Sequence, residues 1–186
     1  MNYFKRGEVY TYLALAALFL AGIFLDPKIA ILMSKLRTPF ITQIMLFISS
    51  LYFLAGSLIL TFIIIFIYNK KKRGICILKL CISLILAWIL TYILKISFGR
   101  QRPEVAFLML DNPSFPSAHA STTFSSLPVL SYYLPKLNIL VILFCVLVSF
   151  SRLYLGVHYL TDVAAGAILG YSISLLILKW KFKKKH

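Results

Sequence analysis

The chain has 186 residues, of which 61% are apolar and 13% charged, and this composition excludes a soluble domain of ordinary make-up. The formal net charge of +15 would suggest nucleic acid as the partner of a soluble protein. Here most lysines and arginines lie at the ends of apolar runs, which is typical of membrane topology and of contact with anionic headgroups. We therefore predict an integral membrane protein with one domain, residues 1–186, and no nucleic-acid partner.

Two membrane spans are predicted in the first third of the chain, with a short charged segment between them. The first apolar run, residues 10–25, ends at Asp26-Pro27, and no small-residue cleavage site follows it, which argues against a signal peptide. Residues 27–37 are too short and too charged to span, so they either lie in the membrane interface or form a plain connector. The second run, residues 39–68, exceeds the roughly 20 residues that cross a bilayer, which predicts one tilted or projecting span.

Four further spans are predicted in the rest of the chain. We place them at residues 75–96, 117–134, 138–153 and 158–178. The longest polar stretch, residues 97–117, separates the third span from the fourth. The predicted fold class is therefore all-α: a polytopic membrane helical bundle with six transmembrane helices.

The positive charges outside the spans predict the orientation of this bundle. With the N-terminus inside, twelve lysines and arginines fall in cytoplasmic segments, among them the run at 70–73 and five lysines at 179–185, and seven fall outside. Because the cytoplasmic side of membrane proteins is richer in positive charge, both termini are predicted to be cytoplasmic. The segments 95–119 and 151–162 then face outward together.

These two outward segments contain three groups of polar residues. They are Lys95 with Arg102, then Ser117, Ala118 and His119, and finally Arg152, His158 and Asp162. Ionisable residues beside apolar runs are costly to keep and are typically functional. Three cations, two histidines and a serine at a helix start are typical of a pocket for an oxyanion, and the dianion of a phosphate ester suits them best.

A phosphoryl-transfer reaction can be assembled from these residues. His158 and Asp162 are four residues apart, so on a helix the carboxylate would hold one ring nitrogen and leave the other to attack phosphorus. His119 is predicted to protonate the leaving alkoxide, and water would then hydrolyse the phosphohistidine. Phosphate binding is assigned to Lys95, Arg102, Ser117, the backbone N–H of Ala118, and Arg152.

Each of these residues also has a structural interpretation. Arg100 fits no catalytic spacing, and we interpret it as an interfacial anchor. His119 alone would cap a helix, and Asp162 alone would form a structural ion pair with Arg152. The acidic residues predicted on the outer face are too few and too scattered for a two-metal carboxylate cage, so we predict no metal and no cofactor.

The same residues resemble the three-part signature of the type 2 phosphatidic acid phosphatase superfamily. The matching positions, in order and spacing, are Lys95 with Arg102-Pro103, residues 116–119, and Ser151-Arg152 with His158 and Asp162. The departure is Ala118, where the family usually has glycine. The resemblance implies a six-helix membrane core and metal-independent hydrolysis through a phosphohistidine, with the residue roles given above.

The resemblance also implies a substrate class and a location. The expected function is that of a lipid phosphatase in the bacterial inner membrane, with its site facing the periplasm and a lipid phosphate as substrate. The small size and the basic segment 27–37 resemble the lipid A 1-phosphatase type, and undecaprenyl pyrophosphate or phosphatidylglycerophosphate is the alternative main substrate. An anionic-lipid transporter or binding protein is the alternative of another class, but it leaves the pair His158 and Asp162 unexplained, and the chain has no internal repeats.

Overall fold

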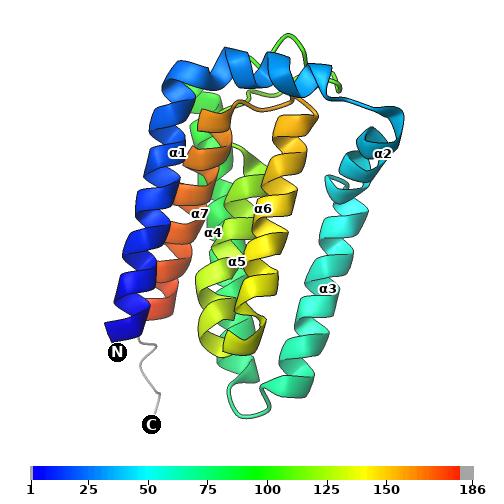
Figure 1. Ribbon diagram of the computed structural model, residues 1–186. Coiled ribbons are helices and arrows are strands. Elements are labelled where there is room, and N and C mark those ends of the chain that lie inside the picture. Colours follow the sequence, from blue (N-terminus) through cyan, green and yellow to red (C-terminus); the bar gives the residue numbers. More distant parts are fainter. Residues whose placement is uncertain (1, 181–186) are drawn as a thin grey trace.

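The computed structural model describes residues 2–180, and helices form its only regular structure over that range (Figure 1). The helices are α1 (Asn2–Lys35), α2 (Pro39–Ile48), α3 (Leu51–Tyr68), α4 (Arg73–Phe98), α5 (Ala118–Tyr133), the single turn η1 (Pro135–Leu137), α6 (Asn138–Tyr154) and α7 (Leu160–Lys179). No strand occurs between residues 2 and 180, so the all-α class is confirmed. The basic tail at 181–185 lies outside the described residues.

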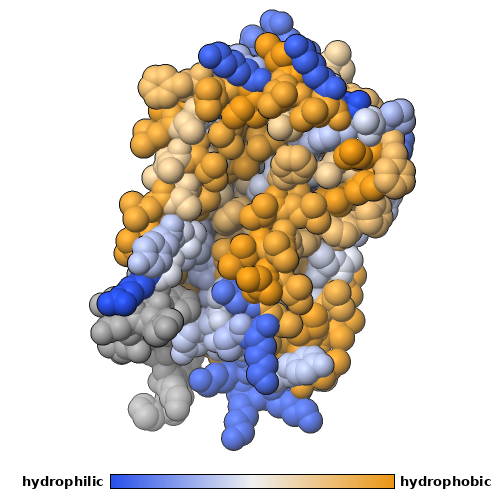
Figure 2. All heavy atoms as spheres, in the orientation of Figure 1, coloured by the Kyte–Doolittle hydropathy of each residue, from blue (hydrophilic) through white to orange (hydrophobic). Residues whose placement is uncertain are grey.

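Five helices of the described chain are long and apolar enough to cross a membrane: α1, α3, α4, α6 and α7. Helix α5 has 16 residues, fewer than the roughly 20 of a full span. Of the six predicted spans, five therefore correspond to helices with the length and composition of a membrane span within the described residues. Figure 2 shows apolar side chains over the flanks of the bundle, with hydrophilic ones gathered mainly towards its two ends. This distribution is that of a multi-pass membrane protein.

Helix α1 does not end at Asp26-Pro27, as the sequence predicted, but continues to Lys35 with Pro27 inside it. A proline inside a helix removes one backbone hydrogen bond and bends the helix, and Figure 1 shows α1 bending over one end of the bundle. Residues 27–35 are therefore the bent last part of α1, which lies across the end of the bundle, and the alternative of a separate connector is wrong. The Asp26 side chain faces inward and is buried, which holds α1 against α7 across the proline.

The single span predicted at 39–68 is also wrong, because Ser49 and Ser50 divide it into α2 and α3. The hydroxyl of Ser50 accepts a hydrogen bond from the Phe53 N–H at 3.1 Å and caps α3. The Ser49 hydroxyl lies 2.8 Å from the hydroxyl of Ser151 on α6. Serines that bond outside the helix ladder favour a break over a continuous helix.

Helix α5 packs against α4, α6 and α7, and its most extensive contact is with α7. Two glycines of α7 make this approach possible, because a Cβ at Gly166 would lie 2.5 Å from the Ser117 carbonyl oxygen, and one at Gly170 closer still to that of Ser121. Small residues that let backbones approach are typical of helix pairs in membranes. The two helices run parallel, so both begin at the same end of the bundle (Figure 1).

One end of the bundle collects the segments that the sequence singled out. Helices α4 and α6 end there, α5 and α7 begin there, and the bent part of α1 crosses over them (Figure 1). The connections 99–117 and 155–159 join these helix ends. The opposite end carries the basic turn at 69–72 and η1.

Candidate active site

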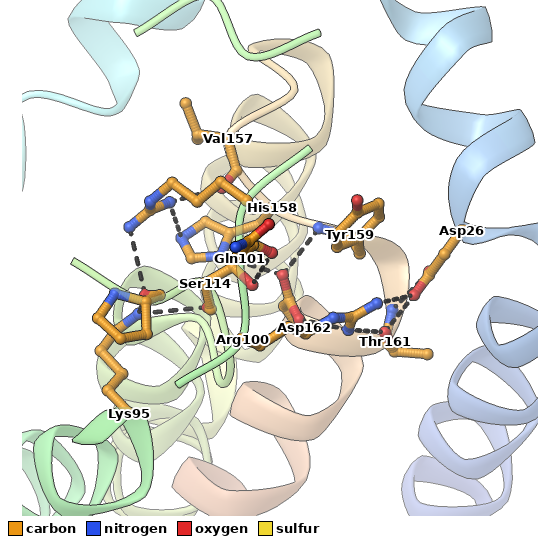
Figure 3. Close-up of polar contacts among 12 residues, drawn as sticks. Asp26, Lys95, Arg100, Gln101, Ser114, Val157, His158, Tyr159, Thr161 and Asp162 are labelled. Carbon is orange, nitrogen blue, oxygen red and sulfur yellow. Dashed lines mark hydrogen bonds and ion pairs between the residues drawn. The ribbon is translucent and has the colours of Figure 1, made fainter. Parts of the chain in front are cut away.

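His158 lies in the connection between α6 and α7, two residues before α7 begins. The prediction that His158 and Asp162 share one helix face is therefore wrong, although the two side chains do meet. The His158 Nδ1 lies 3.5 Å from the Asp162 Oδ2 and makes no hydrogen bond within residues 2–180. The His158 Nε2 lies 3.4 Å from the Arg102 Nη1 (Figure 3). The imidazole thus lies between a carboxylate and a guanidinium.

Gly156 makes the turn that places His158. Its φ of +65° is one that side-chain-bearing residues rarely adopt, and a Cβ there would meet the Arg37 guanidinium and lie 3.0 Å from the Val105 carbonyl oxygen. The Phe107 N–H donates to the Leu155 carbonyl at 2.9 Å and ties the long connection to this turn. The position of the histidine is therefore set by backbone packing.

Asp162 is fully buried in the first turn of α7, and both its oxygens accept hydrogen bonds. Oδ1 accepts from the Arg100 Nη1 at 2.7 Å, and Oδ2 accepts from the Tyr159 N–H at 2.9 Å. The ion pair that was considered between Asp162 and Arg152 is replaced by one with Arg100. Our interpretation of Arg100 as an interfacial anchor is wrong, because its guanidinium also pairs with Asp26, 74 positions earlier in the chain.

The three predicted phosphate-binding cations approach His158 from three elements. Lys95, at the end of α4, is buried and donates to the carbonyl oxygens of Pro113 and Ser114, the latter at 3.2 Å (Figure 3). Arg102 donates from Nη1 to the Val157 carbonyl at 2.5 Å and is further held by the backbone and side chain of Asn112. Carbonyl oxygens thus orient both side chains without neutralising their charge.

Arg152 and Ser117 contribute buried polar atoms that make no hydrogen bond within residues 2–180: the Arg152 Nε and the Ser117 hydroxyl. Such atoms are costly to bury without a partner, and a donor-rich pocket of this kind suits an anionic ligand. Ser117 is the N-cap of α5, as predicted, and its N–H donates to the Asp162 carbonyl at 2.9 Å. Ala118 begins α5, where backbone N–H groups have no partner inside the helix.

His119 lies in the first turn of α5, with its ring against the break between α2 and α3. Its Nε2 lies 3.0 Å from the Ser49 carbonyl oxygen, and because a carbonyl only accepts, Nε2 carries the proton. The Nδ1 is then the ring atom left for proton transfer. Nothing in the sequence pointed to Ser49 as its partner, because the run around Ser49 is predicted to be a continuous helix.

The electrostatics of the pocket favour a neutral His158. Burial has the largest effect, and the charges of Arg152, Arg102 and Lys95 add to it; together they lower the pKa of His158 well below the ordinary value of 6.5. Burial also lowers the pKa of Arg102, which the Asp162 carboxylate raises, and a guanidinium still keeps its charge near neutral pH. A neutral imidazole has a free lone pair, so the ring is prepared for nucleophilic attack.

An apolar groove of about 860 Å³ lies beside the pocket, between α3 and the helices α4, α5 and α6. Leu51, Leu58, Leu84, Trp88 and Phe144 are among the side chains that line it. The groove reaches the level of the site, since Leu51 follows shortly after Ser49 in the chain and Thr122 is one turn from His119.

Among residues 2–180, no three His, Cys, Asp or Glu side chains are grouped so that they would hold a metal ion.

Comparisons with known proteins agree with this geometry. Residues 77–186 match the PAP2 superfamily. The chain is 32% identical to phosphatidylglycerophosphatase B of Bacillus subtilis over 168 residues, which cover 81% of this chain and 80% of that protein.

Two solved structures are also similar. A transmembrane PAP2-type phosphatidylglycerolphosphate phosphatase from Bacillus subtilis superposes with a TM-score of 0.69 at 26% identity, over 91% of this chain and 94% of that one. LpxE of Aquifex aeolicus superposes with a TM-score of 0.65 at 27% identity, over 84% and 96%. The buried histidine among three cations and the matches to both sequence and fold lead to one conclusion: the chain belongs to the PAP2 superfamily and is a multi-pass membrane lipid phosphatase.

Proposed function

We propose that the protein removes a phosphate group from a lipid headgroup through a phosphohistidine formed on His158. The observation that carries this proposal is the placement of the ring, with Nδ1 towards Asp162 and Nε2 towards Arg102. The carboxylate favours a proton on Nδ1, which leaves the lone pair on Nε2. The Arg102 guanidinium lies near the His158 Nε2 and also attracts the phosphate oxygens. It would therefore hold phosphorus within reach of the attacking Nε2.

The first step forms a bond between the His158 Nε2 and phosphorus and breaks the bond between phosphorus and the lipid oxygen. His119 enters this step doubly protonated, as an imidazolium paired with the phosphate dianion. Its Nε2–H stays bonded to the Ser49 carbonyl, the leaving oxygen takes the Nδ1 proton, and the ring becomes neutral. In the second step a water molecule gives its proton back to His119 and attacks phosphorus, which breaks the bond to His158. Inorganic phosphate leaves, and both histidines return to their starting state.

Positive charge and hydrogen-bond donors for the phosphate oxygens come from the protein itself. Lys95, Arg102 and Arg152 supply the charge, while the Ser117 hydroxyl and the N–H groups at the start of α5, including that of Ala118, supply donors. Fixed cations and donors that are in place before reaction stabilise the transition state without reorganisation. The proposed reaction therefore proceeds without a metal or other cofactor.

We further place the whole chain as one domain, 1–186, in the bacterial inner membrane. In this arrangement α5 is the sixth span, both termini are cytoplasmic, and the site faces the periplasm. This orientation is supported by the basic residues at the end of the bundle opposite the site, in the turn at 70–73 and at Lys136. Such positive charge is typical of the cytoplasmic side. A phosphate carried at the height of lipid headgroups would then reach His158 from the outer leaflet.

The substrate is proposed to place its tail in the apolar groove beside α3. A groove of about 860 Å³ with apolar walls suits hydrocarbon chains, and Thr122, one turn from His119, is among the residues that line it. Similarity to phosphatidylglycerophosphatase B over four-fifths of both chains supports phosphatidylglycerophosphate as the main substrate. Lipid A 1-phosphate, which the sequence favoured, and undecaprenyl pyrophosphate stay as the alternatives, because the pocket contacts mainly phosphate.

The test is phosphate release by detergent-purified protein, with a chelator present, from phosphatidylglycerophosphate, undecaprenyl pyrophosphate, lipid A and phosphatidic acid in parallel. The proposal predicts release that survives chelation, is abolished by His158→Ala, and is highest with phosphatidylglycerophosphate. A different order of release among the four lipids would change the substrate assignment but would not affect the proposed mechanism. No release from any of the four, with lipid binding intact in wild type and only gradually weaker in His158→Ala, would instead indicate an anionic-lipid binding or transport protein.

A further inference from the structure

Asp26 is a buried carboxylate on α1, outside the residues 77–186 that match the family. Its side chain is 5% exposed and packs against the first turn of α7, where its Oδ1 accepts a hydrogen bond from the Thr161 N–H at 3.0 Å. Its Oδ2 accepts from the Thr161 hydroxyl and, at 2.9 Å, from the Arg100 Nη2 (Figure 3). A buried charge is stable only with several partners of this kind, so the position of Asp26 is specified by the connection after α4 and by the start of α7.

Gly22 lets α1 come close enough for these contacts. It lies one turn before Asp26 on the same face of α1, and a Cβ there would lie 2.8 Å from the Thr161 Cγ2 and 2.9 Å from the Thr161 N. Both distances are below those that real Cβ atoms show. The backbone of α1 therefore packs directly onto the first turn of α7.

Arg100 connects Asp26 to the carboxylate that faces the nucleophile. Its Nη1 donates to the Asp162 Oδ1 at 2.7 Å and its Nη2 to the Asp26 Oδ2, while its guanidinium carbon lies 4.2 Å from the centre of the Tyr159 ring. A planar guanidinium that bridges two carboxylates and stacks on an aromatic ring has little freedom to rotate. Holding Oδ1 in this way turns the Asp162 Oδ2 towards His158 (Figure 3).

From this chain of contacts we propose that Asp26 and Arg100 are positioning residues for the nucleophile, acting on His158 through Asp162. The inference rests on the proposed function, which assigns the attack on phosphorus to His158. Charge supports it as well as geometry: Arg100 alone would neutralise Asp162, whereas Asp26 takes a share of the guanidinium. Asp162 then keeps the negative charge that stabilises the His158 ring as it becomes positive on bonding to phosphorus.

The alternative role for Asp26 is structural only, as a carboxylate that caps the N-terminus of α7. The two roles predict different measurements. A cap contributes to the stability of the fold and leaves the turnover of folded protein alone. A positioning residue changes kcat, because it acts on the transition state, and leaves KM nearly constant, because it does not touch phosphate.

The experiment compares Asp26→Asn with Glu8→Gln as its matched control. Asp26→Asn keeps the shape and one acceptor oxygen but loses the charge that holds Arg100. Glu8→Gln removes another α1 carboxylate that pairs with α7, at 2.9 Å from the Lys179 Nζ, at the opposite end of the bundle. With phosphatidylglycerophosphate, Asp26→Asn is expected to lower kcat about tenfold or more and to change KM by less than about twofold. Glu8→Gln is expected to leave both unchanged.

A double-mutant comparison tests whether Asp26 acts through Arg100. Arg100→Gln should lower kcat on its own, and adding Asp26→Asn to it should change kcat by less than about twofold more. Arg100→Lys keeps the charge but cannot bridge two carboxylates in one plane, so it should lose activity as Asp26→Asn does. If Asp26→Asn does not fold, Arg100→Lys carries the test alone.

Unchanged kcat in Asp26→Asn and in Arg100→Lys would overturn the inference, as would independent, multiplicative losses in the double variant. If these results came with normal turnover by wild type and none by His158→Ala, only the positioning role would fail. Absence of turnover in wild type would instead count against the proposed function.

Discussion

The contact between α5 and α7 gives the sharpest mutational test, at a residue that touches no substrate. In Gly166→Ala the new Cβ would lie 2.5 Å from the Ser117 carbonyl oxygen, against at least 3.4 Å for an ordinary contact. The obstacle is backbone, so it cannot rotate away, and the two helices must separate by up to about 0.9 Å along this line.

This separation acts on two properties at once. Overpacking of this kind costs typically about 1–3 kcal/mol of the free energy of unfolding. The same movement stretches the 2.9 Å hydrogen bond from the Ser117 N–H to the Asp162 carbonyl, which joins the phosphate-binding start of α5 to the carboxylate behind His158. A displacement of about 1 Å between reacting groups lowers rates by up to about 100-fold. We therefore expect a lower unfolding temperature and a kcat/KM reduced about 10- to 100-fold.

Gly56→Ala is the matched control, because a Cβ at Gly56 in α3 would meet no atom within 4 Å. Alanine in place of glycine inside a helix raises the free energy of unfolding by up to about 1 kcal/mol. This variant should therefore be at least as stable as wild type, with unchanged kcat/KM. The assays are thermal unfolding in detergent and phosphate release over a range of substrate concentrations. Wild-type kcat/KM in Gly166→Ala would refute the argument that this contact sets the pocket.

Two further predictions concern charge. Because His158 must be neutral to attack and its pKa is lowered below 6.5, kcat/KM of wild type should fall on acidification only below that pH. Arg102→Gln removes one cause of the lowering, so the acid limb should move to higher pH with the same substrate, and a shift to lower pH would contradict the assignment. Arg152→Lys keeps a charge but loses the fork of donors, so kcat/KM should fall about tenfold or more; equal activity would show that charge alone suffices.

The grouping of the candidate site residues could be predicted from sequence because the signal is local in the chain. Charged residues next to apolar runs, placed in three short segments, indicate an anion pocket before any contact is known. The pairing of His158 with Asp162 was also anticipated, but for the wrong reason. The spacing of four suggested a helix, whereas the turn at Gly156 brings the two side chains together from a loop and a helix start.

The features that were mispredicted all depend on contacts between distant segments. Asp26-Pro27 has the local signals of a helix end, yet α1 continues, because Asp26 bonds to α7 and to Arg100. The serines that divide α2 from α3 do not interrupt an apolar run by hydropathy, and Ser49 contacts Ser151 on α6. The ion pairs of Arg100 were missed for the same reason, since one of its partners lies on the first helix.

The claim at the centre of this account is covalent transfer of phosphate to His158, and it can be observed directly. Radiolabelled phosphatidylglycerophosphate is mixed with the protein in the presence of a chelator, quenched in alkali within the first turnover, and the labelled peptide is mapped. The account predicts an acid-labile, alkali-stable label on His158 that reaches inorganic phosphate with time and is absent from His158→Ala. Phosphate release with no label on His158, or with unchanged release from His158→Ala, would contradict it.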